Sequence, residues 1–442
     1  MSADLNGVAV LLPQIGHDLG TSSESIGAIV SVAALAFAAP LILVGRVADR
    51  VGARRLLLVG VVLFAASATV CAVADSFGVL LVGRALQGVA SACAFTTSLA
   101  VIDAMFPADR RAFAVGLWGA AAGVGGAIGP LLAGGLAAVW SWRAFFAVNI
   151  PFGVFSFVCL LAFVPRSTAD RGRDLDLGRL VTLTAAVALV VGGLQNAAPN
   201  GWGAAGTIIP LVAGAGLGAV LAMRRRAKGP LVPTRVTRPM PFRVGTWVAT
   251  AENWGAGVVL VLVPPALQAA RDVGVLQTGL LFLSFSVASA LTGAASGFLV
   301  RTLGARTVLR VGLAVLAVGL AALALLGPAA ALGPLLVALA FAGAGNGVVY
   351  SVATSYALTD TAVKDAGEAS GVLTMARLLG LTLAIALSSS LVVWVDGLDL
   401  GFAWAGLRVA LALGAVVVAV GTVPLWRGER QAVAASVASA HD

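Results

Sequence analysis

The sequence predicts an all-α protein that crosses a membrane many times. Of its 442 residues, 60% are hydrophobic and only 11% are charged, whereas a soluble domain carries about 25% charged residues. The apolar residues are gathered in runs long enough for a helix to cross the hydrocarbon core, which takes about 20 residues. Reading along the chain gives about fourteen such runs by hydropathy. Composition and run length therefore both predict a polytopic helical bundle.

The predicted spans follow one another closely, with short polar or basic segments between most of them. In order they lie at 4–17, 25–44, 56–74, 78–102, 112–138, 144–164, 178–196, 205–223, 243–267, 276–300, 307–327, 332–356, 369–394 and 402–425. The first run is the shortest, although a full span takes about 20 residues. We therefore expect either that the natural polypeptide starts upstream of Met1 or that its first helix is thin.

The basic residues lie mainly in alternate loops. The formal net charge is +9, which in a soluble protein would suggest a nucleic-acid partner. If the N-terminus is placed in the cytoplasm, 23 of the 28 lysines and arginines fall in cytoplasmic loops or in the C-terminal tail. Only Arg143, Arg271 and Arg408 then lie outside. Because cytoplasmic loops are enriched in lysine and arginine, we predict a multi-pass protein of the cell membrane with both termini in the cytoplasm and no nucleic-acid partner.

The sequence offers little that suggests catalysis or metal binding. His17 and His441 lie too far apart in the chain to suggest a metal site. The three cysteines, Cys71, Cys93 and Cys159, fall in predicted spans, where we interpret them as small packing residues. The sequence contains no phosphate-binding loop of the G-x-x-x-x-G-K-[ST] type. We expect no enzymatic activity, no cofactor or metal, and no direct drive by ATP.

A charged loop between the second and third spans, residues 45–55, carries the most informative pattern. It reads GRVADRVGARR, with its glycines, acid and relevant arginines at Gly45, Asp49, Arg50, Gly52, Arg54 and Arg55. Gly45 would let another helix approach closely, and Gly52 would permit a tight turn. Asp49 lies at the C-terminal end of its own helix, where the macrodipole disfavours an anion. We expect its partner to be an arginine or the N-terminus of a different helix, unless this is only a basic loop that sets the topology.

Asp4, Arg84 and Glu252 are charged residues inside predicted spans. Charges are costly in hydrocarbon, and residues of this kind are functional candidates by default. Asp4 and Arg84 each have a simpler explanation as well. Asp4 could belong to a polar N-terminal tail, and Arg84 could extend its side chain to the outer interface.

Glu252 also has an alternative, structural interpretation. Its carboxylate could be hydrogen-bonded to Trp247, Asn253 or Trp254. Arg377, in the thirteenth span, is a candidate counter-charge for Glu252, unless it lies at the cytoplasmic end of that span.

The fifth span has an unusually small side-chain face. Its glycines and proline include Gly125, Gly129, Pro130, Gly134 and Gly135. Small faces let helices approach closely, and a proline removes one backbone hydrogen bond. We expect Gly129 and Pro130 to belong to a close contact with the eighth span or with the opposite bundle. The alternative is general packing of small residues.

An internal repeat predicts the architecture. The segment 45–57 recurs in weaker form at 297–309, an offset of 252 residues, and Asp49 becomes Arg301 in the copy. The offset maps the second span onto the tenth. We therefore predict two six-helix bundles, residues 1–165 with helices 1–6 and residues 243–442 with helices 9–14. Residues 166–242 would form a linker that contains the inserted helices 7 and 8.

These patterns resemble the major facilitator superfamily, in particular its fourteen-helix drug:proton antiporters. Residues 45–55 are similar to the superfamily's G-x-x-x-D-R-x-G-R-R/K loop, with Ala53 where a basic residue is expected. The GRALQG stretch around Arg84 is similar to its R-x-x-Q-G spacing, and residues 4–13 resemble the start of the antiporters' first helix. The glycines and proline of the fifth span resemble the antiporter motif G-x-x-x-G-P-x-x-x-G-G.

The resemblance implies a secondary active transporter that exports small amphiphilic compounds, drugs or metabolites, in exchange for protons by alternating access. The alternative is a proton-coupled uptake symporter of the same fold. Proton coupling needs a titratable acid, for which Asp4 and Glu252 are candidates, and the family assigns the arginine at the position of Arg84 a role in coupling. The loop 45–55 would be a gating and structural motif. The expected partners are a small-molecule substrate, protons and the lipid bilayer, and we expect a monomer.

Overall fold

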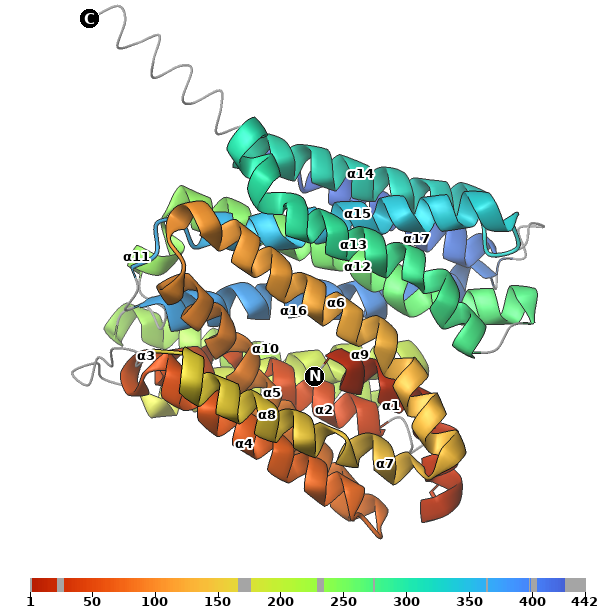
Figure 1. The fold of residues 1–442 in the computed structure, drawn as a ribbon, viewed down its shortest axis with the longest axis horizontal. Coiled ribbons are helices and arrows are strands. Elements are labelled where there is room, and N and C mark those ends of the chain that lie inside the picture. Colours follow the sequence, from red (N-terminus) through yellow and green to blue (C-terminus); the bar gives the residue numbers. More distant parts are fainter. Residues whose placement is uncertain are drawn as a thin grey trace, which may run out of the picture.

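A computed structural model shows a bundle of helices (Figure 1), and it describes residues 2–21, 28–165, 176–228, 234–272, 275–362, 365–396, 398 and 404–425. The helices of this part are α1 (Ser2–Leu19), α2 (Ala28–Ala38), α3 (Leu41–Val51), α4 (Ala53–Ala72), α5 (Phe77–Met105), α6 (Ala108–Val139), α7 (Trp142–Ala147), α8 (Asn149–Phe163), α9 (Leu177–Asn200), α10 (Ala205–Lys228), α11 (Thr234–Thr237), α12 (Met240–Arg271), α13 (Val275–Leu303), α14 (Ala305–Leu326), α15 (Leu332–Ala357), α16 (Ala366–Asp396) and α17 (Ala405–Val420). The predicted C-terminal tail after residue 425 and two parts of the predicted linker, 166–175 and 229–233, lie outside the described residues.

The described helices include many that can cross a membrane. By length and composition there are eleven, or twelve if the bent pair α2 and α3 forms one span. In this count α7 and α8 together form one span, and α1 and α6 are not included. The prediction of an all-α membrane protein with many spans is therefore confirmed, but the predicted number of fourteen is not shown.

The second predicted span is broken rather than continuous. Its two parts, α2 and α3, are inclined by 45°, and Pro40 directly precedes α3. Because proline has no backbone N–H and its ring clashes with the preceding turn, it interrupts helices at such positions. Because of the bend, α3 runs in a different direction from α2 where it packs on α16.

The helices pack into two groups with an additional pair (Figure 1). In the N-terminal group, α1 packs on α6, and α5 packs on α2 and α4. In the C-terminal group, α15 packs on α13 and α14, and α12 packs on α16. In the pair predicted to be inserted, α9 and α10 pack on each other, and α9 also lies against α2 and α16. Residues 165 and 243 remain predicted boundaries of these groups.

The two groups meet along a seam that is formed mainly by α3 and α6 on one side and α13, α15 and α16 on the other. Apolar side chains fill part of it, since Met375 and Leu378 of α16 pack against the cluster formed by Phe37, Leu41 and Val44. Glycines bring the backbones close. A Cβ atom at Gly297 of α13 would lie 3.1 Å from the Cβ of Phe113 in α6.

The end of the bundle where α3 joins α4, α13 joins α14 and α16 begins is called the arginine-rich end below. Both of its inter-helix junctions turn on a glycine with positive φ, Gly52 at 100° and Gly304 at 79°. The tight turn expected at Gly52 is therefore confirmed. Gly304 occupies the corresponding position in the internal repeat, so both copies use the same turn.

Replacing Gly52 by alanine is expected to destabilise the protein, because a side chain in left-handed backbone costs roughly 1–2 kcal/mol. The measurement is the thermal unfolding midpoint in detergent. Gly78→Ala is the matched control, because a Cβ atom at Gly78 would meet no atom within 4 Å. Equal midpoints for the two variants would contradict the assignment of Gly52 as a turn that requires glycine.

Candidate functional site

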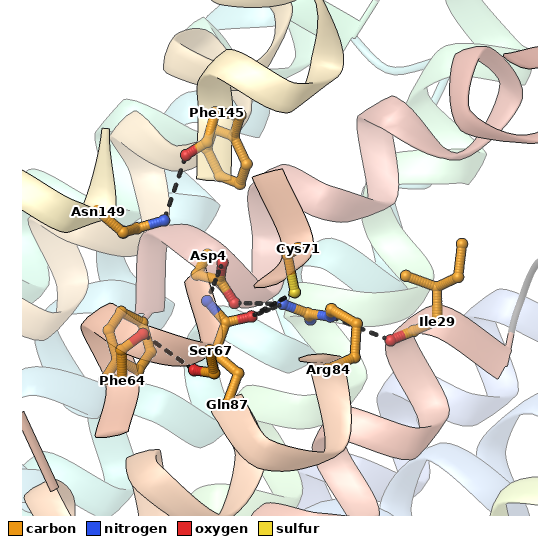
Figure 2. Close-up of polar contacts among 9 residues, drawn as sticks. All are labelled: Asp4, Ile29, Phe64, Ser67, Cys71, Arg84, Gln87, Phe145 and Asn149. Atoms are coloured by element: carbon orange, nitrogen blue, oxygen red, sulfur yellow. Dashed lines mark hydrogen bonds and ion pairs between the residues drawn. The ribbon is translucent and has the colours of Figure 1, made fainter. Parts of the chain in front are cut away.

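A buried ion pair links the first helix to α5 (Figure 2). Arg84 Nη1 donates a hydrogen bond to Asp4 Oδ2 at 2.6 Å and another to Gln87 Oε1 at 2.6 Å. Gln87 Nε2 in turn donates to Asp4 Oδ1 at 3.2 Å. Because Arg84 and Gln87 are three residues apart on α5, they share one face of that helix. The structure thus brings together two of the three predicted coupling residues, Asp4 and Arg84.

The surroundings of this pair exclude the simpler explanations of its two charges. Asp4 is only 3% exposed, so it does not belong to a solvated tail. Arg84 is completely buried, so its side chain does not extend to the interface. Arg84 Nε donates to the carbonyl oxygen of Ile29 at 3.2 Å, and the guanidinium carbon lies 5.8 Å from the centre of the Phe146 ring. Its Nη2 has no hydrogen-bond partner within the described part of the chain.

Glu252 is the buried acid of the C-terminal group. It is 1% exposed on α12, and its Oε2 accepts a 2.6 Å hydrogen bond from Asn253 Nδ2. Of the expected structural partners, Asn253 is therefore the one that binds it. Trp247 is half exposed, and Trp254 Nε1 has no hydrogen-bond partner among the described residues.

Arg377 of α16 is the cation that acts on Glu252. It is 3% exposed and lies eleven residues into α16, about 16 Å from its first residue at 1.5 Å per residue. Arg377 therefore lies within the helix and not in its first turn. Its Nη2 donates to the carbonyl oxygen of Tyr350 at 2.8 Å, and its guanidinium carbon lies 4.0 Å from the centre of the Tyr350 ring.

Asp49 closes the arginine-rich end of the seam. Its two carboxylate oxygens accept hydrogen bonds from the backbone N–H groups of Gly367 at 2.8 Å and Glu368 at 3.0 Å. These groups lie in the first turn of α16, where unpaired N–H groups and the helix dipole attract an anion. Of the two partners expected for Asp49, an arginine or a helix N-terminus, the structure shows the helix N-terminus.

Two further contacts hold the same junction. Gly45 lies directly against the carbonyl oxygen of Gly367, so even a methyl group there would clash. Arg46 Nη1 lies 3.5 Å from Glu368 Oε1 across the seam. The close approach of another helix expected at Gly45 is therefore confirmed, and that helix is α16.

The other arginines of the loop differ in their surroundings. Arg54 Nη2 donates to the carbonyl oxygen of Leu161 at 3.0 Å, within the N-terminal group. Arg50 and Arg55 are exposed. Their predicted role in setting the topology stays a prediction.

Sequence reasoning missed the acids that precede and begin α16. Glu368 is completely buried and faces Arg46. Asp365 receives a two-pronged contact from Arg235, with Nε at 2.8 Å and Nη2 at 3.0 Å. The sequence feature that could have revealed them is the position of both acids just before the apolar run 369–394, because carboxylates are stabilised near a helix N-terminus.

The glycine face of α6 contacts the first helix. A Cβ atom at Gly7 of α1 would lie 2.8 Å from the carbonyl oxygen of Gly129. Gly129 therefore has a close neighbour within its own group. The contact expected with the eighth span or with the opposite bundle stays a prediction at Gly129, although α6 as a whole packs on α13 and α15. Gly134 and Gly135 face open space. Gly125 is half-buried, and the side chain of Pro130 lies outside the described part.

Comparison with known sequences gives a family match over almost the whole chain. The sequence model of the Major Facilitator Superfamily matches residues 1–224 and 244–442. The chain is 32% identical over 394 residues to Multidrug resistance protein Stp of Mycobacterium tuberculosis, covering 88% of this chain and 73% of that protein. It is 30% identical to a probable actinorhodin transporter of Streptomyces coelicolor, with 86% and 68% covered. A tetracenomycin C resistance and export protein of Streptomyces glaucescens is 27% identical, with 87% and 72% covered.

Solved structures with the same arrangement of helices include two transporters. The human organic anion transporter MFSD10 superposes with a TM-score of 0.66 over 96% of each chain, at 15% identity. The proton:xylose symporter XylE also gives 0.66 at 15% identity, over 96% of this chain and 92% of that one. At this identity the likeness shows the fold alone.

Arg84→Leu is expected to destabilise the protein strongly, because it leaves Asp4 as a buried charge without a partner, which costs about 3–5 kcal/mol. The double variant Asp4→Asn with Arg84→Leu should recover part of that loss. Unfolding midpoints in detergent for the two single variants and the double variant form a mutant cycle. Arg50→Leu, at an exposed arginine, is the control. Additive effects at Asp4 and Arg84 would show that the pair is not coupled.

Proposed function

This chain belongs to the Major Facilitator Superfamily, and from that premise we propose that this secondary transporter exports small amphiphilic compounds, drugs or metabolites, in exchange for protons. The observation that carries the proposal is the buried acid Glu252 on α12, within range of the charge of Arg377 on the neighbouring α16. Proton-coupled transport requires such a group to gain and lose a proton as the two helix groups rock. The relatives at about 30% identity named above support export rather than uptake, since their names describe resistance and export.

The alternative function is proton-coupled uptake on the same fold. A proton:xylose symporter shares the arrangement of helices, so the fold itself does not favour one direction. Export is favoured because the relatives more similar in sequence are named for drug resistance or for antibiotic transport. The direction of substrate movement under an imposed pH gradient distinguishes the two functions.

The two buried acids differ in how strongly their charges are held. Asp4 accepts hydrogen bonds from both Arg84 and Gln87, and protonating it would leave Arg84 as a buried cation without its counter-ion. Glu252 accepts its described hydrogen bond from a neutral amide. Proton coupling is shared between Asp4 and Glu252, and Arg84 is the counter-charge of Asp4. Of the two acids, Glu252 is the one whose carboxylate takes up a proton more readily.

The proposed topology has fourteen spans, with α1 and α6 crossing the membrane in addition to those counted above. The 32 residues of α6 exceed the length of a span. Both termini then lie in the cytoplasm, and the arginine-rich end faces the cytoplasm because basic residues gather there. The two six-helix bundles, 1–165 and 243–442, rock about the seam, and residues 166–242 hold the inserted pair.

The loop 45–55 acts as a gate at the cytoplasmic end. In the described conformation this end is held by the Asp49 carboxylate on the first turn of α16 and by Arg46 near Glu368. Opening toward the cytoplasm breaks both contacts, since they join opposite groups. Asp49 therefore stabilises one of the two conformations and carries no proton.

Glu252→Gln is expected to abolish substrate accumulation driven by a pH gradient while leaving substrate exchange at equal pH intact, because the amide cannot release a proton. The measurement is transport in proteoliposomes with an imposed pH gradient and a panel of dyes and drugs. Asp75→Asn, which neutralises an exposed acid between α4 and α5, is the control and should leave gradient-driven transport unchanged. Full proton coupling in the double variant Asp4→Asn with Glu252→Gln would refute the assignment of the carriers.

Asp49→Asn should slow transport about tenfold or more while substrate binding in detergent changes little. The neutral amide forfeits a charge-assisted bond at a helix N-terminus, which is worth about 1–2 kcal/mol in partly buried geometry. Binding affinity and transport rate are measured on the same preparation. If binding falls as much as transport, Asp49 belongs to the substrate site and not to the gate.

A further inference from the structure

Three residues connect the buried acid Glu252 to the opposite helix group. Glu252 and Arg377 lie on helices in close contact, since a Cβ atom at Gly380 of α16 would lie 2.6 Å from the Thr250 carbonyl oxygen of α12, and Arg377 binds the Tyr350 carbonyl oxygen at 2.8 Å and its ring at 4.0 Å. Tyr350 then stacks on Trp118, with ring centres 5.9 Å apart and planes inclined by 22°. Glu252 belongs to α12, Arg377 to α16 and Tyr350 to α15, all in the C-terminal group. Trp118 belongs to α6 in the N-terminal group. A series of interactions therefore runs from the acid across the seam.

Trp118 is held firmly on its own side. Its ring lies 4.6 Å from that of Phe95 in an edge arrangement, and its Nε1 donates to Ser98 Oγ at 3.1 Å. Both partners lie on α5. The neighbouring Gly119 leaves room for the Tyr350 ring, since a Cβ atom at Gly119 would lie only 3.2 Å from Tyr350 Cδ1. Because Trp118 is fixed, a displacement of Tyr350 changes the contact between the groups instead of being absorbed by a loose side chain.

The stack lies deeper in the bundle than the contacts that close the arginine-rich end. Along α6, Phe113 touches Gly297 of the opposite group, and Trp118 follows five residues, or about 7 Å, further into the bundle. Glu252 lies twelve residues from the start of α12, about 18 Å along the helix. The stack thus stands between the acid and the closed end.

Among the described side chains around Glu252, Arg377 is the cation on which the charge of Glu252 acts. In the described part, the charged or titratable side chains that act with Glu252 are Arg377 of α16 and Tyr350 of α15. One turn along α12, at Gly255, the neighbours from α14 and α17 are the apolar Leu316, Leu320 and Val418. A change of charge on Glu252 therefore has its main effect on Arg377.

We infer that Arg377, Tyr350 and Trp118 are positioning residues that convert the protonation of Glu252 into opening of the seam at the arginine-rich end. The inference rests on the proposed function, because it takes Glu252 as a proton carrier. It adds the route by which a proton bound in the C-terminal group alters a contact with the N-terminal group.

The proposed step moves one proton and breaks no covalent bond. A proton taken up by the Glu252 carboxylate removes the negative charge that acts on the buried Arg377 guanidinium without a direct hydrogen bond, and this disfavours the burial of that cation. Arg377 Nε has no hydrogen-bond partner in the described structure, so the guanidinium has donor capacity left for water. Conformations that admit water to Arg377 are then favoured, and they require Tyr350 to move away from Trp118. Protonation shifts the population toward the open arginine-rich end.

The test measures the distance between the groups at that end as a function of pH. Spin labels are attached at Val51→Cys and Leu303→Cys, which are exposed positions on α3 and α13, after Cys71, Cys93 and Cys159 have been replaced by alanine. In this reference protein, acidic pH should raise the fraction of molecules with a long distance. Trp118→Leu and Tyr350→Leu should change the closed-to-open ratio by about 2-fold to 10-fold, the value of an aromatic pair, and should flatten its dependence on pH.

Control variants separate positioning from general damage. Trp140→Leu makes the same chemical change at an exposed residue just after α6 and should keep the full pH response. Trp118→Phe retains an aromatic ring and should restore most of the response that Trp118→Leu loses. Glu252→Gln should hold the long-distance fraction at its acidic value at every pH.

The outcomes distinguish this inference from the proposed function. If Glu252→Gln abolishes the pH response but Trp118→Leu and Tyr350→Leu retain it in full, the relay through the stack is refuted and proton carriage by Glu252 stands. If Glu252→Gln itself keeps the wild-type response and gradient-driven transport, the proposed carrier is wrong and the inference falls with it. A flattened response in Trp118→Leu, restored in Trp118→Phe, supports the relay.

Discussion

A charge inside hydrocarbon must have a counter-charge or a dipole beside it, and this constraint organises the structure of the protein. Asp4 is paired with Arg84 in the N-terminal group, and Glu252 is close enough to Arg377 to feel its charge in the C-terminal group. Asp49 uses the N-terminus of α16 instead of a side chain. Each of these arrangements joins at least two helices, so the buried charges fix which helices are neighbours.

The seam between the groups combines close backbone contact with few strong polar links. Glycines permit the contact, as at Gly45 against Gly367 and at Gly371 against Leu41. Dispersion forces between small faces stabilise such packing without locking it. The polar links, Asp49 to α16 and Arg46 near Glu368, lie at the arginine-rich end. A seam of this kind can open at one end while the helices within each group keep their packing.

The internal repeat explains why the seam has two related contacts and why they differ. Gly45 and Gly297 occupy corresponding positions, and each brings its helix against the opposite group, α3 against α16 and α13 against α6. Gly52 and Gly304 then turn the chain in both copies. The acid is present only in the first copy, because Asp49 is replaced by Arg301 in the second. The carboxylate bond to a helix N-terminus is therefore made by one half of the molecule.

The sequence by itself determined the membrane class, the approximate positions of the helices, the turn at Gly52 and the need of Asp49 for an external partner. These features depend on local hydropathy, on glycine's freedom at positive φ and on the dipole of one helix, all of which are encoded within a few residues. Only the tertiary structure decided that Asp4 meets Arg84, that Gly129 faces Gly7 of α1, and that Tyr350 stacks on Trp118. The paired residues are separated by 80 positions or more in the chain, and their meeting depends on how whole helices pack. For the same reason the sequence showed Arg377 as a charge in a span, while its depth beside Glu252 and Tyr350 followed from the packing of α12, α15 and α16.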